Sequence, residues 1–242
     1  MSPFAAAGRI RSRTRLLLVA CILLLASQAA SAAGSAPSGN VLFDQSDLSI
    51  LGGASPTQQM TVAKDEIADD FEVTNPEGWT ITQVVLAVNY TDMNSTPPGQ
   101  PPYLLTFYPD ENGHPAATAS CDYASAQGVT DYPGSGLNVS VVLPAPCMLS
   151  AGRYWMAMSA ILDPPPYSLW VYNAPPAFVF NEPVYRNPDD HWGTGCVDWT
   201  PAYSSNCLFN PAGGKPNMVF QLLGTVGMSE LIFDDGFDPP IP

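Results

Sequence analysis

LNVSVVLPAPCMLSAGRYWMAMSA, residues 137–160, predicts two β-strands separated by a turn-rich link. In its first half, residues 137–143, apolar side chains recur at every second position, which is the pattern of a strand with one buried face. Residues 154–160 form the second expected strand. The link, residues 144–152, contains two prolines and a glycine, and Cys147 within it is expected to attach the link to another part of the fold.

Similar short runs recur along the chain between turn signals rich in Pro and Gly. The further strands expected are residues 41–44, 59–63, 67–73, 79–90, 103–108, 117–123, 168–172, 178–180 and 218–223. The run 79–90 is apolar on both faces, which predicts a central strand. No helical stripe of useful length and no repeat period is present. The sequence therefore predicts an all-β fold, a single antiparallel, jelly-roll-like β-sandwich with long irregular C-terminal loops.

The first 33 residues have the organisation of a signal peptide. Four arginines precede an apolar core at residues 16–26, and small residues follow it at 29–33. The core is shorter than the roughly 20 residues that span a bilayer, and no later run is long enough, so no transmembrane span is expected in the mature chain. The alternative is a lipidated Cys21, because LVAC at 18–21 has the shape of a lipobox. We favour a cleaved signal and a secreted or cell-surface protein, because the apolar run before Cys21 is short.

Behind the signal peptide we expect a disordered linker at 34–40, the sandwich domain at 41–224 and an acidic tail at 225–242. The whole chain has 22 acidic and 8 basic residues, a net charge of −14. Loss of residues 1–33 would remove four of the basic residues. A strongly acidic protein surface repels nucleic acid and anionic membranes, so we expect no nucleic-acid partner. We also expect a monomer.

Four cysteines remain in the expected mature chain. An even number in an exported protein predicts disulfides, and four cysteines allow three pairings. We favour Cys121 with Cys147 and Cys196 with Cys207, because each pair closes a local segment. No CxxC spacing suggests zinc.

Several short motifs are distinctive: VLFDQ (41–45), ADDF (68–71), LLTFYPD (104–110), PCMLSAGRYW (146–155), RNP (186–188), GTGC (193–196), Trp199 and IFDDGFD (232–238). The last motif is similar to a short Phe–acid–Gly–Phe–acid ending found on some exported bacterial proteins. Together the motifs resemble those of a loosely defined group of secreted bacterial β-sandwich proteins without a settled activity. The resemblance covers most of the expected mature chain and implies a fold and export, but it transfers no catalytic residue. The chain departs from the group at 189–192, where DDHW replaces a glycine-rich segment.

The sharpest polar cluster is Asp189, Asp190, His191 and Asp198, in the region of the second cysteine pair. Carboxylates and an imidazole on one braced loop could hold a divalent cation such as calcium, and no other cofactor is expected. The spacing fits no EF-hand or zincin template, so an exposed polar loop is the competing interpretation.

Aromatic residues offer a second kind of site. Trp192 and Trp199 lie in the irregular C-terminal region and are the tryptophans least surely buried. Flat exposed rings of this kind stack on sugars, which makes an extracellular polysaccharide or an envelope component the expected partner.

Two neighbouring acids, Asp69 and Asp70, precede Phe71 in an expected strand. Adjacent strand residues point to opposite faces, so one of the pair is expected to point inward or toward the sheet edge. The alternatives for this residue are a loop cap and a structural calcium ligand, and we favour a solvated sheet edge for the pair.

Catalytic machinery is hard to identify in the sequence. The chain has only two histidines, and neither a GxSxG nor an HExxH motif. The leading hypothesis is therefore a secreted, non-catalytic β-sandwich that binds carbohydrate outside the cell or at its surface. The alternatives are an exported glycosidase-like hydrolase whose paired carboxylates meet only in space, and a purely structural envelope protein.

Overall fold

The computed structural model describes residues 39–47, 51–56, 58–59, 64–91, 101–130, 139–163, 167–173, 179–208 and 215–227. The expected signal peptide with Cys21, nearly all of the expected linker and most of the acidic tail lie outside these residues. Within the described ranges, no helix has the length and apolar character needed to cross a membrane.

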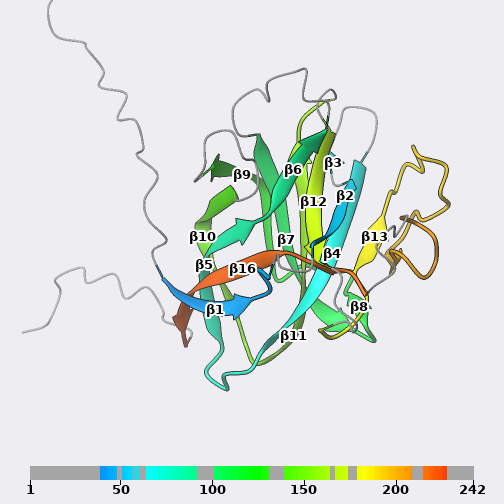
Figure 1. The fold of residues 1–242 in the computed structure, drawn as a ribbon. Coiled ribbons are helices and arrows are strands. Elements are labelled where there is room, and N and C mark those ends of the chain that lie inside the picture. Colours follow the sequence, from blue (N-terminus) through cyan, green and yellow to red (C-terminus); the bar gives the residue numbers. More distant parts are fainter. Residues whose placement is uncertain are drawn as a thin grey trace, which may run out of the picture. The chain divides into compact units, whose positions relative to one another are not determined.

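The described chain folds into two hydrogen-bonded β-sheets (Figure 1). The strands of the larger sheet are β1 (Asn40–Asp44), β3 (Gln58–Gln59), β4 (Lys64–Val73), β5 (Trp79–Leu86), β7 (Pro102–Glu111), β8 (His114–Pro115), β9 (Cys121–Thr130), β10 (Val139–Leu149), β11 (Gly152–Ile161), β13 (Val184–Arg186), β14 (Thr200–Pro201) and β16 (Phe220–Val226). The strands of the smaller sheet are β2 (Leu51–Pro56), β6 (Val88–Thr91), β12 (Tyr167–Asn173) and β15 (Asn217–Met218).

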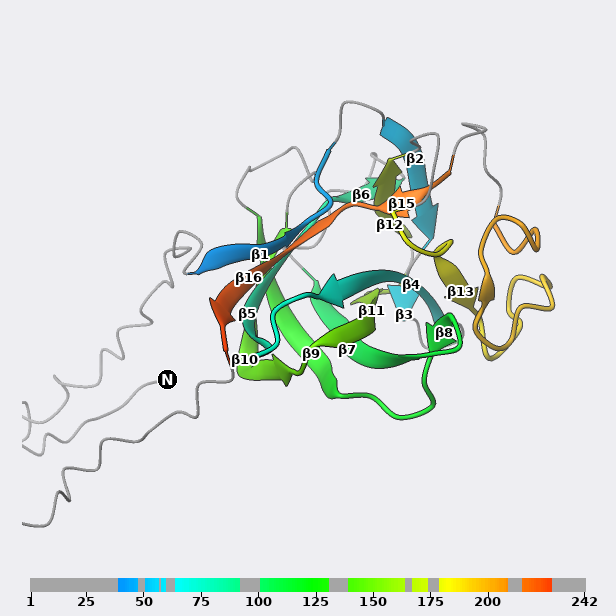
Figure 2. The same ribbon diagram turned by 90° about the horizontal axis from the view of Figure 1, so that it is seen from below.

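The larger sheet runs in the order β1–β16–β5–β10–β9–β7–β11–β4–β13–β14, with β3 between the ends of β11 and β4 and β8 attached to β7. Every pairing in both sheets is antiparallel except that of β11 with β3. Figure 2 shows β2, β6, β12 and β15 on one side and β4, β7, β9, β10 and β11 on the other. The predicted all-β, antiparallel fold class is confirmed.

Two strands pass from one sheet into the other. Three backbone hydrogen bonds mark the crossing, from Ala87 N to Val219 O, from Val171 N to Ala87 O and from Val219 N to Val171 O. The expected strand 79–90 is therefore divided at Ala87 into β5 and β6, because the chain bends there from the larger sheet to the smaller. Val219 divides β15 from β16 in the same way. β5 lies between β16 and β10, which confirms its predicted central position.

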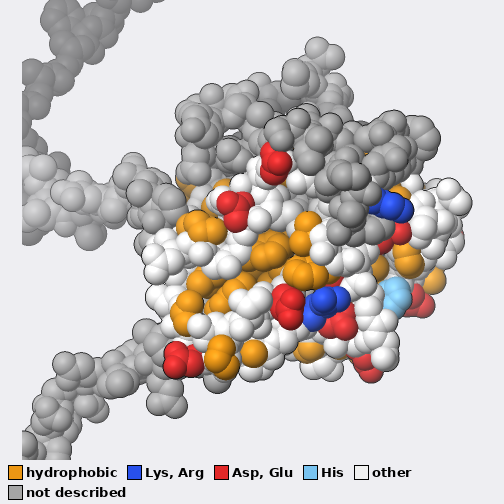
Figure 3. Space-filling view, turned by 60° about the horizontal axis from the view of Figure 1, so that its bottom comes forward, with side chains coloured by type: hydrophobic (Ala, Val, Ile, Leu, Met, Phe, Trp, Pro, Cys, Tyr) orange, Lys and Arg blue, Asp and Glu red, His pale blue; other side chains and the backbone are white. Residues whose placement is uncertain are grey.

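The aromatic core lies around Phe71 of β4. This fully buried ring contacts the rings of Phe43, Trp79, Phe107, Tyr154 and Phe220, which come from five other strands. Burial of such large side chains dominates core energetics, so this cluster holds six strands of the larger sheet together. Figure 3 shows hydrophobic side chains that reach the surface in the middle of one face, with a group of basic and acidic side chains directly beside them.

Residues 137–160 differ from the prediction in the link at residues 144–152. β10 continues to Leu149, so Cys147 lies in a strand and the turn is confined to residues 150–151. Between Val142 and Cys147 the register with β5 shifts. This irregularity accommodates Pro144 and Pro146, which donate no ladder hydrogen bond. β9 begins only at Cys121, and residues 179–180 form a bend where a strand was expected.

Both disulfides have the pairing favoured from the sequence. Cys121 of β9 is bonded to Cys147 of β10, and Cys196 is bonded to Cys207 in the C-terminal region. The first joins neighbouring strands at a place where β9 and β10 are no longer hydrogen-bonded to each other. It therefore links β9 to the part of β10 that pairs with β5 beyond the register shift.

Gly224 of β16 allows a close approach of two strands. A Cβ atom at this position would lie 2.0 Å from the carbonyl oxygen of Thr80. We expect Gly224→Ala to destabilise the protein by about 2 kcal/mol or more, because β16 must move away from β5. The measurement is the free energy of unfolding in urea. Thr225→Ala, at an exposed position of the same strand, is the matched control, and equal effects of the two substitutions would contradict the close-approach argument.

Candidate functional site

Residues 179–208 carry the site candidates and pack on the outward face of β4, β7 and β11. A small second core forms beneath them from Ala68, Tyr108, Trp155 and Val184, and Trp199 packs against it. β13 also extends the sheet by pairing with β4. The position of this segment is set by acidic side chains of β4, each with its own partner.

Glu66 of β4 holds the segment through Arg186. The Nη2 group of Arg186 donates to both carboxylate oxygens of Glu66, at 3.0 and 2.9 Å, and to the hydroxyl of Tyr108 at 3.2 Å. The guanidinium carbon lies 4.2 Å from the centre of the Trp199 ring, a cation–π distance. Burial raises the pKa of Glu66, although the charge of Arg186 acts in the opposite direction. The Glu66–Arg186–Trp199 stack therefore joins β4 to two parts of segment 179–208.

Asp70 holds the beginning of the same segment. It accepts hydrogen bonds from the backbone N–H of Asn181, at 3.2 Å, and from its side-chain amide, at 2.7 Å. Arg153 of β11 lies 3.9 Å from the carboxylate and covers the ring of Phe180. Burial raises the pKa of Asp70, as does the nearby charge of Asp110, while the bonds from Asn181 and the charge of Arg153 lower it.

Asp69 points to the opposite face of β4, into the core. Its Oδ2 accepts from the side-chain amide of Gln45 and from the backbone N–H of Met218, both at 2.7 Å, and its Oδ1 accepts from the backbone N–H of Asp70 at 3.0 Å. Burial raises the pKa of Asp69 well above its usual value, and the charge of Asp70 raises it further. This carboxylate connects β4 to the chain after β1 and to β15.

The prediction of a solvated edge for Asp69 and Asp70 is therefore wrong. Each is only 1% exposed, although they do point to opposite faces as the strand alternation predicts. The sequence could not show that segment 179–208 covers the outward face and that Gln45 and Met218 approach the inward one. These contacts supply donors that make burial of the acids tolerable.

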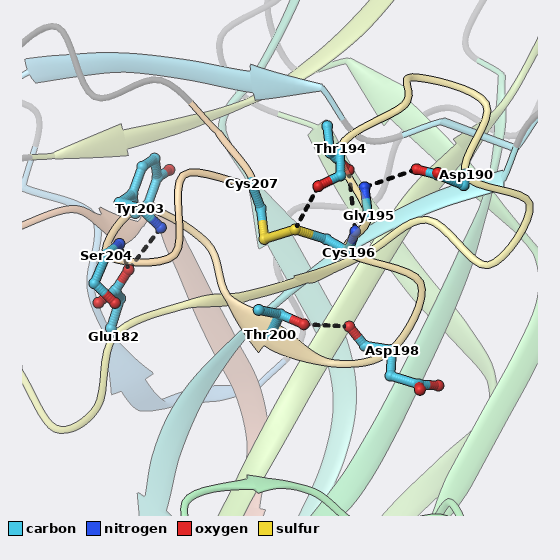
Figure 4. Close-up of a disulfide and its surroundings, with 10 residues drawn as sticks. All are labelled: Glu182, Asp190, Thr194, Gly195, Cys196, Asp198, Thr200, Tyr203, Ser204 and Cys207. Atoms are coloured by element: carbon cyan, nitrogen blue, oxygen red, sulfur yellow. Dashed lines mark hydrogen bonds between the residues drawn. A yellow bond between two sulfur atoms is a disulfide. The ribbon is translucent and has the colours of Figure 1, made fainter.

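The loop that follows Arg186 is braced at several points (Figure 4). The Cys196–Cys207 disulfide joins its two arms. Oε1 of Glu182 accepts hydrogen bonds from the backbone N–H groups of Tyr203 and Ser204, both at 2.6 Å. The backbone of this loop is thus held by the disulfide and by the Glu182 carboxylate. An exposed side chain on the loop therefore has a well-braced support.

The four predicted metal ligands do not form a common site. Oδ1 of Asp190 accepts from the backbone N–H of Gly195 at 2.9 Å, and the carbonyl of Asp198 accepts from the hydroxyl of Thr200 at 2.8 Å (Figure 4). Asp189 and His191 are exposed. In the part of the chain that the structure describes, which includes all four residues, no three His, Cys, Asp or Glu side chains gather to hold a metal ion. The geometry gives the cation-site hypothesis no support.

The two predicted ligand-binding tryptophans have different environments. Trp199 is half-buried, lies edge-on to Tyr108 and is covered by Arg186. Trp192 is 43% exposed, and the His191 ring stands edge-on to it at 4.7 Å between centroids. Trp199 therefore supports the loop, whereas Trp192 presents apolar ring surface to solvent.

Sequence reasoning missed the roles of Glu66 and Arg186. One signal was present: β4 carries five acids in ten residues, whereas only four basic residues lie beyond residue 33. A strand of that composition with apolar residues between its acids needs cations or amide donors wherever it is buried. The sequence did not indicate which basic residue would meet which acid.

Comparison of this chain with models of known protein families, with characterised proteins and with solved structures finds no match.

The raised pKa of Asp69 predicts a pH dependence of stability. Its pKa is higher in the folded protein than in the unfolded chain, so folding favours the protonated form. This contribution is complete below the ordinary Asp pKa of about 4 and is lost as the pH rises through the raised value. We therefore expect the free energy of unfolding to increase as the pH is lowered through the raised pKa toward the ordinary Asp pKa, and Asp69→Asn to flatten that increase.

The measurement is urea unfolding across this pH range, with Glu111→Gln at an exposed position as the control. An unchanged slope in Asp69→Asn would contradict the argument. Asp69→Ala is expected to cost about 3 kcal/mol, because the donors on Gln45 and Met218 would lose their buried acceptor.

Proposed function

We propose that the protein is a non-catalytic binding protein that acts outside the cytoplasm, secreted or at the cell surface, and that its ligand is a carbohydrate. The observation that carries the proposal is the exposed indole of Trp192 on the braced loop. Flat apolar rings bind the apolar faces of sugars, and a rigid support reduces the conformational entropy lost on binding. Two disulfides support an oxidising location.

The surroundings of Trp192 support a neutral, polar ligand. Asp189, Asp190, His191 and Thr194 of the same loop are exposed, and the His191 ring contacts that of Trp192, so the loop offers hydrogen-bonding groups near the indole in the chain. A net charge of −14 disfavours anionic polymers. An uncharged polysaccharide, with hydroxyl groups around apolar ring faces, suits this combination.

No described feature specifically favours the hydrolase alternative. The carboxyl groups with raised pKa values are Glu66, Asp69 and Asp70, and each is buried against structural partners. A structural envelope protein remains the competing interpretation, and it is distinguished by the absence of any soluble ligand.

The test is a glycan array probed with the exported chain, followed by titration of the best ligand. We expect binding to neutral polysaccharide fragments, and we expect Trp192→Ala to weaken it about tenfold, the loss that corresponds to one stacked ring. Val197→Ala, at a position of the same loop that is 42% exposed, is the matched control and should bind normally. Silence across plant, fungal and bacterial glycans, or full binding by Trp192→Ala, would reject the proposal.

A further inference from the structure

An apolar strip lies on the outward side of β10. Val142, Pro144, Ala145, Pro146 and Met148 are all exposed, Val142 at 57% and Met148 at 52%. We call these five residues the β10 strip. It continues toward β9, where Val129 pairs beside it with Ser140 and is 42% exposed.

β10 belongs to an uncharged part of the larger sheet, although β9 on its other side carries Asp122. β16, β5 and β10 are consecutive in the larger sheet and contain no Asp, Glu, Lys or Arg. The chain as a whole has 22 acids, so three adjacent strands without a carboxylate form a distinct surface. An acidic peptide would meet less charge repulsion here than on β4 or near residues 189–198.

The chain leaves the described structure beside the β10 strip. Gly227 follows β16, and its backbone N–H donates to the carbonyl of Gly78 at 2.8 Å. The hydroxyl of Thr80 donates to the carbonyl of Gly227 at 2.7 Å. Thr80 is the cross-strand partner of Met148, and such partners share one face of a sheet. Gly227, where the described residues end, is therefore held on the strip's side of the sheet, with β5 between it and Met148.

Residues 228–242, MSELIFDDGFDPPIP, have the composition and length to cover the strip. Apolar residues 231–233 and Phe237 alternate in groups with the acids of the segment. Ten extended residues reach about 33 Å, whereas the strip from 142 to 148 spans about 20 Å.

We propose that residues 228–238 of the same chain dock on the β10 strip, with Leu231, Ile232 and Phe233 against Val142 and Met148. The apolar residues of the segment match apolar surface that the strands leave exposed, and its acids meet no like charge on β16, β5 or β10. This inference is independent of the carbohydrate proposal.

The test measures oxidation of Met148 by hydrogen peroxide, followed by peptide mass spectrometry, because sulfoxide formation depends on exposure of the thioether. Three chains are compared with the intact protein. The first ends at Gly227, the second carries Leu231→Ser, Ile232→Ser and Phe233→Ser, and the third is the matched control Asp234→Asn with Asp235→Asn. Met156 and Met158, fully buried in β11, report any loss of the fold.

We expect Met148 to oxidise several-fold faster in the first and second chains than in the intact protein, and at the intact rate in the control. Equal rates in the intact, truncated and serine-substituted chains would overturn the proposal. The proposal would also be overturned if Met148 were protected more strongly at higher protein concentration and sedimentation showed a dimer, since a second copy would then cover the strip. Release by the asparagine control alone would also overturn it, because charge and not apolar contact would then hold the segment.

Discussion

The buried carboxylate of Asp69 is the interaction on which the arrangement of the two sheets depends. It lies on β4, and it binds Gln45 after β1 and the backbone of Met218 in β15. Gln45 in turn donates to the Met218 carbonyl at 2.8 Å. β1 and β4 are far apart in the strand order of the larger sheet, and β15 belongs to the smaller sheet. One side chain therefore joins three regions that no strand ladder connects directly.

β4 serves both faces of the fold because its acids alternate. The inward carboxylate connects the sheets, whereas the outward Glu66 and Asp70 hold segment 179–208. Burial opposes ionisation of all three. The proposed binding loop thus rests on a costly electrostatic arrangement, compensated by Arg186, Arg153 and amide donors. A disulfide and a cation–π stack add to the support, so Trp192 is presented by a well-anchored loop.

The sequence predicted the parts of the structure that local pattern determines. Period-two alternation located most strands, and the even cysteine count with local spacing indicated both disulfides. It also identified 79–86 as part of a central strand. The division of that run at Ala87 depends on hydrogen bonds to Val171 and Val219, which lie far along the chain. The extension of β10 through two prolines depends on a register shift that only its pairing with β5 reveals.

The candidate site was less predictable because its geometry depends on long-range contacts. Trp192 and Trp199 look equivalent in the sequence, yet Arg186 covers only the second. Asp69 and Asp70 read as solvated acids because their donors come from residues 45, 181 and 218. No local composition rule brings such residues together. The sequence correctly placed Asp189 and Asp190 on a loop. Their proximity in the sequence does not bring them together around a common metal position in the structure.

The pairing of β1 with β16 has a consequence for how the chain reaches its final state. Asn40 lies opposite Gly224, so strands from the two ends of the described chain are neighbours, and β16 also supplies one whole side of β5. Protein synthesis proceeds from the N-terminus, so this side of β5 has no partner until residues 220–226 have emerged. Contacts of such high sequence separation make folding slow. Between the synthesis of β5 and that of β16, the growing chain therefore carries an open, uncharged strand edge, which is a binding point for holding chaperones and a risk of aggregation in their absence.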